Sequence, residues 1–538
     1  MKKRLLTMLV TTAVVLSSLT ACGGKTEETT AAQAPVGQAA ESSESAGGTQ
    51  AAPAAGENVI KIARPADSST LDPIITGSNE DIWVINLMLQ GLTKSSADGK
   101  TIEPCLAESW DVSDDGLTYT FHVREGLKFS DGTPVTKDDW QYSLDRFVKS
   151  EESPWRGMIS MVESAEVVDD TTVVFTLNSV SPNFLASSAL FSFAVMPKAY
   201  CEEAGADGIA KKPIGTGPFY LDEWKIGERM TFLKNPYYWD EGKPLADEIV
   251  FTVVADDNTR IMQLQSGEVD AITYVPANRI AELQGLGSVQ VLSFDSTESR
   301  HITLNNSIPQ LSDPKVRMAL LKATDRNAII QAVYFGNAEV STGLIGPAQP
   351  YYNDKIEAVA YDVEGAKALL KEAGYESGFD VKLEIRSGNT NELQEATMIK
   401  EQWAKAGVNV NIEQLDASTV SNDWYDMNFE MMFTSLTSDT ADTNQFATGL
   451  CIADLKDCYH TLWSGNKQKE AENLALEASK EMDTEKRGEL YAQLQEITAE
   501  ENPIIPLYYL PFTAAASDKV KNFTQTPLGV YVFDQLTK

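Results

Sequence analysis

Residues 104–134 read PCLAESWDVSDDGLTYTFHVREGLKFSDGTP, and the order of apolar and polar residues in them predicts local structure. Apolar side chains alternate with polar ones over residues 117–123, which is the period of a half-buried strand, and His122 lies on its polar side. The Asp131-Gly132 pair predicts a turn. Residues 136–139 then predict a capping box that opens a helix. Strand, turn and helix in this order indicate a chain that mixes α and β structure.

The alternation of strand and helix patterns continues toward the C-terminus. Residues 249–271 predict a strand, a helix that stops at a glycine, and a second strand. A further helix, capped near Asp362, leads to a strand over residues 381–385, and strand patterns return at 408–412 and 429–433. Two α/β blocks with linked termini predict a two-lobed α/β protein.

The first residues form a targeting segment. Three basic residues precede an apolar run over residues 5–19 that is too short to span a bilayer. The following Leu19-Thr20-Ala21-Cys22-Gly23 resembles the lipobox of bacterial lipoproteins, which implies a signal peptide over 1–21 and a diacylglyceryl thioether on Cys22. Two acyl chains give stable anchoring. The alternative is an ordinary signal peptide followed by an incidental cysteine.

Residues 22–56 are rich in small and polar amino acids. Such a composition buries too little apolar surface to offset the entropy of ordering, so it predicts a lipid-anchored flexible tether. No later stretch approaches eighteen consecutive apolar residues. The expected location is therefore extracytoplasmic, anchored to the bacterial cell membrane.

The overall composition disfavours several classes of function. The chain has 538 residues, with 44 Lys and Arg against 78 Asp and Glu, and a formal net charge of -34 at pH 7. This charge opposes binding to nucleic acid phosphates. Three His and five Cys leave few ligands for zinc or haem, so we expect neither a metal nor a cofactor. The motifs H-E-x-x-H, C-x-x-C and G-x-S-x-G are absent, and no catalytic residue is predicted.

Cysteine spacing offers one candidate disulfide. Cys451 and Cys458 are close in a chain that is predicted to be exported, where oxidation is permitted. Two unpaired thiols, or pairs that involve Cys105 and Cys201, remain alternatives.

Several motifs, in order along the chain, closely resemble those of the bacterial extracellular solute-binding proteins of family 5, which are the receptors of peptide and nickel ABC importers. The matching segments are 70–73, 104–110, 115–121, 129–134, 215–219, 235–239, 264–270 and 315–320. The resemblance implies a type II periplasmic-binding-protein-like fold of cluster C, in which two lobes joined by a two-segment hinge close on a ligand and an extra subdomain sits on lobe I.

The same resemblance predicts the division of the mature chain. Lobe I combines 57–99, 214–300 and 510–538. Domain II, at 100–213, packs on lobe I. Lobe III comprises 301–509.

Two charged residues are candidates for ligand binding. Ligands of open α/β sheets bind beyond the carboxyl ends of strands, where Arg386 ends one predicted strand and Asp439 follows another. Residues 386–391 are similar to the Arg-x-x-Asn-x-Asn stretch of the dipeptide-binding branch, whose Arg takes the peptide carboxylate. Residues 436–446 are similar to the region whose Asp pairs with the free amine of the peptide, which falls on Asp439. The alternative for each residue is a solvated or ion-paired position on the surface.

Three positions bear on the choice of ligand. The tryptophan of the family pattern is Leu436 here, and its proline is Thr443, which implies altered side-chain pockets or another ligand. His301, near the predicted hinge, is a candidate ligand for a metal chelate, although a structural histidine is the commoner case.

These observations leave three hypotheses. The first is a lipid-anchored, monomeric receptor that delivers di- to tetrapeptides to the transmembrane subunits of an ABC permease. The second keeps the fold but binds a nickel chelate, an opine or a saccharide. The third, an extracellular hydrolase, lacks a nucleophile and base with recognisable spacing.

Overall fold

The computed structural model describes residues 58–452 and 461–538. The predicted signal peptide at 1–21, Cys22, the tether at 22–56 and Cys458 all lie outside the described residues. Lipid anchoring and the Cys451–Cys458 disulfide therefore stay predictions. Within the described part of the chain, none of the helices combines the length and the apolar character needed to cross a bilayer.

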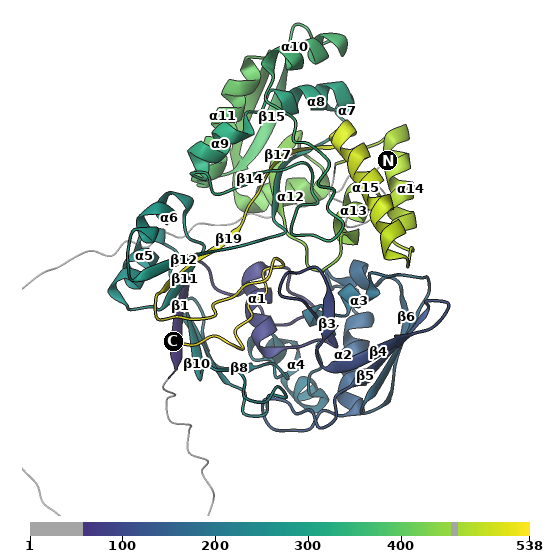
Figure 1. The fold of residues 1–538 in the computed structure, drawn as a ribbon, viewed down its shortest axis with the longest axis vertical. Helices are drawn as coiled ribbons and strands as arrows, with labels where there is room; N and C mark the ends of the chain where they lie inside the picture. Colours follow the sequence, from purple (N-terminus) through teal and green to yellow (C-terminus); the bar gives the residue numbers. More distant parts are fainter. Residues whose placement is uncertain (1–57, 453–460) are drawn as a thin grey trace, which may run out of the picture. The chain divides into compact units, whose positions relative to one another are not determined.

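Three distant parts of the chain supply a seven-stranded sheet (Figure 1). In spatial order its strands are β12 (Val289–Phe294), β19 (Phe512–Ser517), β11 (Ala271–Thr273), β1 (Val59–Arg64), β10 (Glu248–Val253), β9 (Arg229–Lys234) and β8 (Phe219–Lys225). β1 runs parallel to β10 and β11, and the other pairs are antiparallel. The predicted strand, helix and strand over 249–271 are confirmed, with α5 (Asp257–Ser266) ending at Gly267 in the left-handed region.

Residues 104–134 contribute two strands to a four-stranded antiparallel sheet. Its strands, in spatial order, are β4 (Ala107–Val112), β5 (Thr118–Val123), β7 (Thr172–Leu177) and β6 (Val162–Asp169). The predicted strand is confirmed as β5, and the exposed His122 reaches Asp111 at 2.8 Å. The predicted helix is α2 (Lys137–Val148), and the Asp139 carboxylate accepts a hydrogen bond from the Thr136 backbone N–H at 2.9 Å.

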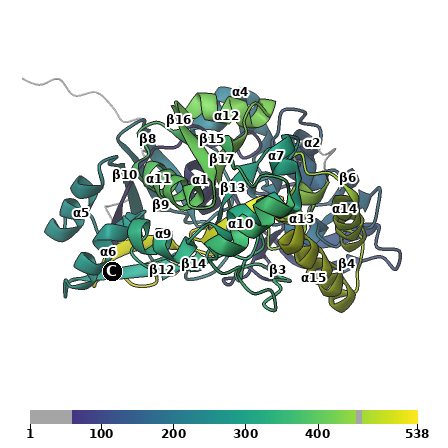
Figure 2. The ribbon, with the colours of Figure 1, turned by 90° about the horizontal axis from the view of Figure 1, so that it is seen from above.

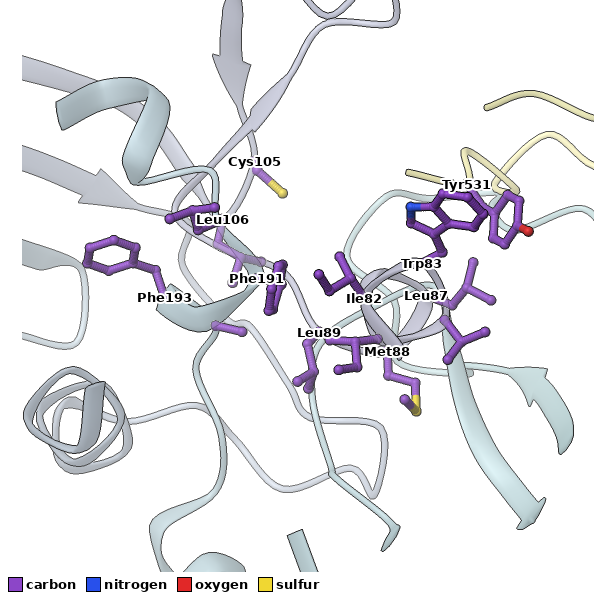
Figure 3. Close-up of a cluster of buried hydrophobic side chains, with 14 of the residues drawn as sticks. Ile82, Trp83, Leu87, Met88, Leu89, Cys105, Leu106, Phe191, Phe193 and Tyr531 are labelled. Carbon is purple, nitrogen blue, oxygen red and sulfur yellow. The ribbon is translucent and has the colours of Figure 1, made fainter. Parts of the chain in front are cut away.

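The four-stranded and seven-stranded sheets share one hydrophobic core. Helix α1 (Asn79–Met88) lies within it and presents Ile82, Leu87 and Met88 to side chains from other segments (Figure 3). Trp83 of this helix packs edge-on against Tyr531, with ring centroids 5.7 Å apart, which joins the C-terminal segment to the same core. The shared core implies that the two sheets fold as one body.

A six-stranded sheet has a separate core. Its strands, in spatial order, are β14 (Glu339–Val340), β18 (Ile504–Tyr509), β13 (Ser299–Leu304), β17 (Met431–Leu436), β15 (Phe379–Arg386) and β16 (Val408–Leu415). β15 runs parallel to both β16 and β17. β15 and β17 lie together in Figure 1, and Figure 2 shows β16 beside them. The predicted strands at 381–385 and 408–412 are confirmed. The strand expected at 429–433 begins later, at Met431, and extends to Leu436, while Phe429 precedes it and packs with Val420 and Met432.

Helices cover both faces of the six-stranded sheet. One face packs on α8 (Pro314–Lys322), α9 (Arg326–Val333), α10 (Val363–Glu372) and α11 (Thr390–Ala404), whose apolar residues share its core. On β17, Met431 and Phe433 belong to that core, whereas Met432 packs with α12 (Ala417–Asp426). Successive strand residues point to opposite faces, so α12 covers the other face.

Further helices and strands complete the described fold. They are β2 (Thr93–Ser95), β3 (Ile102–Pro104), α3 (Phe184–Ser187), α4 (Lys198–Lys211), α6 (Ala277–Gln284), α7 (Pro309–Ser312), α13 (Asn444–Cys451), α14 (Asn466–Ala478) and α15 (Thr484–Glu501), with single 3₁₀ turns at Arg156–Ile159 and Phe191–Phe193. Helices α13, α14 and α15 enclose a third apolar cluster with Leu344 and Ile345.

Two short segments connect the seven-stranded sheet with the six-stranded sheet. The chain passes from β12 to β13 through residues 295–298 and returns from β18 to β19 through residues 510–511. The segments are bonded to each other, because the Leu510 N–H donates to the Glu298 carbonyl at 3.2 Å and the Ser296 hydroxyl donates to the Leu510 carbonyl. Two adjacent crossing segments are the geometry of a hinge.

We predict that the Asp139→Ala substitution lowers the free energy of unfolding by about 2 kcal/mol. The Asp139 carboxylate accepts from the backbone N–H groups of Thr136 and Lys198, at 2.9 and 2.8 Å, and so joins the starts of α2 and α4. Chemical denaturation measures the change. Asp138→Ala is the matched control, because Asp138 is exposed on the same turn; an equal loss in both variants would contradict the assigned role.

Candidate functional site

The two charged candidates lie at the same edge of the six-stranded sheet. Arg386 is the last residue of β15, and Asp439 follows the end of β17 by three residues. β15 and β17 are parallel neighbours, with Glu384 opposite Met432, so their carboxyl ends open on one side. No hydrogen bond or ion pair between described residues joins Arg386 to Asp439 directly.

Asp439 is a poorly solvated carboxylate without a cationic partner among the described residues. Its Oδ2 accepts a hydrogen bond from Gln445 Nε2 at 2.8 Å, and its backbone N–H donates to Gln445 Oε1 at 3.0 Å. Burial raises the pKa of Asp439 to about 6, against the opposing effect of the Gln445 hydrogen bond. A cation that binds nearby stabilises the deprotonated form of such a carboxylate.

The loop that carries Asp439 is hydrogen-bonded to the first of the two crossing segments. The Ser438 N–H donates to Thr297 Oγ1 at 2.9 Å, and the Thr297 N–H donates in turn to the Pro527 carbonyl at 3.0 Å. Thr297 lies in the first crossing segment. Ser438 Oγ also donates to the Thr440 carbonyl at 2.8 Å. The position of Asp439 is therefore tied to one of the two segments that connect the sheets.

The Arg386 side chain is already hydrogen-bonded to Glu392, a residue in the first turn of α11. Its Nε donates to Glu392 Oε1 at 2.9 Å, and its backbone N–H donates to Glu392 Oε2 at 2.7 Å. The Arg386 side chain is 43% exposed, whereas that of Glu392 is 2% exposed. Asn389 caps α11 by accepting from the Glu392 N–H at 3.1 Å, so the Asn of the family stretch has a structural role here. Residue spacing in the sequence does not identify Glu392 as the partner of Arg386.

Behind this pair lies a buried network of charges. Arg300 Nη2 is 2.8 Å from Glu395 Oε2 and 3.4 Å from Glu392 Oε1. The Tyr334 hydroxyl donates to Glu395 Oε1 at 2.7 Å, and the Tyr508 hydroxyl donates to the same oxygen. Removal of Arg300 would leave the buried Glu395 carboxylate without its cation, so this network fixes the start of α11 against the sheet.

A cavity of about 320 Å³ lies beside Asp439. Side chains between residues 154 and 187 line one side, including Trp155 and Met161, and residues from 440–452 and 479–480 line the other, including Thr440, Gln445 and Lys480. Its volume falls within the usual range of small-molecule sites. Gln445 both borders the cavity and bonds to the Asp439 carboxylate, so Asp439 lies next to this space.

The departures from the family pattern have local structural roles. Thr443 precedes α13, and its hydroxyl donates to the Pro350 carbonyl. Leu436 ends β17 and packs against the cluster of α13, α14 and α15. The next arginine after Arg386 in the sequence, Arg487, binds Asp442 through two hydrogen bonds of 2.7 and 3.0 Å, and that pair is buried.

His301 and the cysteines add no further ligand set in the described part of the chain. His301 is fully buried on β13, with Nδ1 3.2 Å from the Ser299 carbonyl oxygen, and burial lowers its pKa to about 3. No disulfide joins the three described cysteines, Cys105, Cys201 and Cys451. No three His, Cys, Asp or Glu side chains in residues 58–452 and 461–538 converge to hold a metal ion.

The family model of bacterial extracellular solute-binding proteins, family 5 Middle, matches residues 101–454. The chain belongs to this family. It is therefore a solute-binding protein of the kind that serves ABC importers, and its relatives are transport proteins rather than enzymes. The predicted two-lobed α/β fold is confirmed by the solved structures of family members.

Two curated relatives illustrate the range of ligands. The dipeptide-binding protein of Escherichia coli is 31% identical over 463 residues, which cover 81% of this chain and 86% of the relative. Heme-binding protein A of Haemophilus influenzae is 32% identical over 466 residues, covering 80% and 83%.

A solved structure of similar extent contains a peptide. The ABC transporter-associated periplasmic binding protein DppA from Helicobacter pylori, in complex with the peptide STSA, matches with a TM-score of 0.78 at 28% identity. The match covers 89% of this chain and 98% of that one.

We predict that the Asp439→Asn substitution stabilises the ligand-free protein at pH 8. Because the folded state raises the pKa of Asp439 from 3.8 to about 6, this group favours folding fully below pH 3.8 and loses that contribution as the pH rises through 6. The free energy of unfolding of the variant should exceed that of the wild type by at most about 3 kcal/mol at pH 8, and the difference should shrink toward pH 4.

Urea denaturation at both pH values measures this difference. Asp426→Asn, which changes an exposed carboxylate at the end of α12, is the control and should follow the wild type at both pH values. A destabilised Asp439→Asn variant at pH 8 would contradict the prediction.

Proposed function

We propose that this protein is the lipid-anchored substrate-binding component of an ABC importer, and that it captures di- to tetrapeptides for delivery to the transmembrane subunits of the permease. It acts as a monomer and releases the peptide unaltered. The observation that carries the proposal is the poorly solvated Asp439 carboxylate, which lacks a described cationic partner at the carboxyl edge of the sheet.

The free amine of the peptide binds Asp439. In the absence of a ligand, burial disfavours the charged form of the Asp439 carboxylate. An ammonium group donates charge-assisted hydrogen bonds to this charged form and balances its charge. Gln445 orients the carboxylate by the two reciprocal hydrogen bonds. The neighbouring cavity of about 320 Å³ then offers room for part of the peptide.

The peptide carboxylate binds Arg386. Glu392 occupies Nε and Nη2 of the guanidinium, and no described residue accepts a hydrogen bond from Nη1. Arg386 can thus donate to a carboxylate without leaving Glu392, whose charge Arg300 also compensates at 3.4 Å. The expected contact at this end is single rather than bidentate, and therefore weaker than the one at Asp439.

Closure of the two lobes supplies the remaining affinity. Each charge-assisted contact contributes about 1.5–3 kcal/mol. Micromolar affinity requires about 8 kcal/mol. We propose lobe I at 57–99, 214–300 and 510–538, domain II at 100–213 and lobe III at 301–509, which close about the segments 295–298 and 510–511.

A non-peptide ligand in the same site is the alternative. Leu436 and Thr443 depart from the dipeptide-binding pattern, and one of the relatives is named for heme. A nickel chelate, an opine or a saccharide would each need different contacts at Asp439. The ligand that copurifies with the protein, identified by native mass spectrometry, distinguishes these cases.

We predict that Asp439→Asn weakens binding of a free-amine dipeptide about tenfold to a hundredfold, because a charge-assisted hydrogen bond is lost. Binding of the N-acetylated form of the same dipeptide should change little. Isothermal titration calorimetry with both peptides measures the two affinities.

The exposed Asp426→Asn variant again serves as the control and should bind both peptides as the wild type does. Equal losses for the free and acetylated peptides would refute the role of Asp439. A complete absence of heat from a dipeptide library, with binding of a nickel chelate, an opine or a saccharide, would replace the peptide proposal by its alternative.

We predict that Cys22→Ser moves the protein from the membrane fraction to the soluble fraction, because the thioether that carries the acyl chains no longer forms. Fractionation and immunoblotting measure the change. Cys105→Ser, which alters a buried cysteine of the folded part, should leave the protein in the membrane fraction. Retention of the Cys22→Ser variant on the membrane would contradict lipid anchoring.

A further inference from the structure

The cavity of about 320 Å³ beside Asp439 lies at the amine end of the proposed peptide site. Thr440, the residue after Asp439, lines this cavity, and so does Gln445, whose Nε2 is 2.8 Å from Asp439 Oδ2. None of the described residues that line it comes from β15 or α11, the elements of Arg386 and Glu392. The cavity therefore adjoins the partner that we propose for the peptide amine, and not the one for the peptide carboxylate.

Apolar atoms form most of the surface of this cavity. The apolar side chains that line it between residues 155 and 180 are Trp155, Met158, Met161 and Val180. Trp155 is held in place, because its Nε1–H donates to the Thr76 carbonyl at 2.8 Å. The two methionines are partly buried, and their unbranched side chains adapt to guests of different shape. The wall thus combines one fixed aromatic ring with two adaptable side chains.

Three hydroxyl groups in the wall already have acceptors within the protein. Ser187 Oγ donates to the Met158 carbonyl at 2.9 Å. On the opposite side, Thr448 Oγ1 donates to the Asn444 carbonyl at 2.7 Å, and Ser479 Oγ donates to a backbone carbonyl of α14 at 2.9 Å. An apolar guest therefore leaves these three donors hydrogen-bonded.

The charges in the wall disfavour a basic guest. None of the described lining residues is Asp or Glu, and the charged residue among them is Lys480. A lysine or arginine side chain of a ligand would lose its hydration in the cavity without gaining an opposite charge. Lys480 would also repel it.

We propose that this cavity binds the first side chain of the peptide, and that the protein selects peptides that begin with a large apolar residue. The amine and the first side chain of a peptide are attached to the same carbon atom. An amine bound at Asp439 therefore places the first side chain, and not a later one, beside the cavity. The inference rests on the proposed function, because it starts from the amine at Asp439.

The bound side chain contacts two parts of the protein at once. Trp155 belongs to the core that the seven-stranded and four-stranded sheets share, whereas α13 on the opposite wall packs with α14 and α15. An apolar side chain between these walls is removed from water, and the gain grows with the apolar area that is buried. Replacement of alanine by leucine at the first position should therefore strengthen binding by about tenfold to a hundredfold.

Isothermal titration calorimetry of the full-length protein with four dipeptides tests the inference. These are leucyl-alanine, alanyl-alanine, alanyl-leucine and lysyl-alanine. We expect leucyl-alanine to bind at least tenfold more tightly than alanyl-alanine, and more tightly than alanyl-leucine, which carries the same side chain at the second position. Lysyl-alanine should bind no more tightly than alanyl-alanine. Tighter binding of alanyl-leucine or lysyl-alanine than of leucyl-alanine would overturn the inference.

A carboxylate placed in the wall provides a second measurement. Met161→Glu should weaken binding of leucyl-alanine at least fivefold and strengthen binding of lysyl-alanine, while binding of alanyl-alanine changes little, because its side chain does not reach this wall. Met262→Glu is the matched control, since it makes the same change at an exposed methionine of α5, and it should bind every dipeptide as the wild type does. An unchanged order of affinities in Met161→Glu would refute the assigned pocket.

This inference and the proposed function fail in different ways. Similar affinities for all four dipeptides would leave the proposed peptide function intact and overturn this inference alone. An absence of heat from all four would overturn the peptide proposal, and this inference with it.

Discussion

The parallel alignment of β15 with β17 is the constraint on which the candidate site depends. It opens the carboxyl ends of both strands on one edge, where Arg386 and Asp439 lie, and it leaves Glu384 opposite Met432 at the other end of β17. A shift of this register by one residue would turn Glu384 into the apolar core and Leu383 out of it. Burial of one face of the sheet therefore holds the polar positions in place.

The buried charges of this sheet are satisfied unevenly. Arg300 and Glu395 pair at 2.8 Å, and two tyrosine hydroxyls complete the set of hydrogen bonds to Glu395. Asp439 has an amide donor but no cationic partner among the described residues, and Glu384 Oε2 accepts no hydrogen bond from them. A buried, charged carboxylate without a cationic partner lowers the stability of the ligand-free protein. A cationic ligand that binds beside it stabilises the charged form. This difference distinguishes the paired Arg300 and Glu395 from Asp439, which we propose as a ligand contact.

Local patterns in the sequence predicted the elements well. Alternation over residues 117–123 and the cap at 136–139 correspond to β5 and the start of α2, because strand period and helix capping depend on near neighbours. The sheet order did not follow from such patterns. β19, from the C-terminal part of the chain, lies between β12 and β11, and pairing over that distance leaves no local signal.

The sequence by itself determined the family, the α/β class and the two strand ends near which Arg386 and Asp439 lie, since these depend on motifs and short-range periodicity. Only the tertiary structure decided which charged side chains already have hydrogen-bond partners within the protein. Glu392 binds Arg386, Gln445 orients Asp439, and no donor among the described residues reaches Glu384 Oε2. Partners of this kind are set by side-chain direction and burial across the fold, so residue identity and spacing do not specify them.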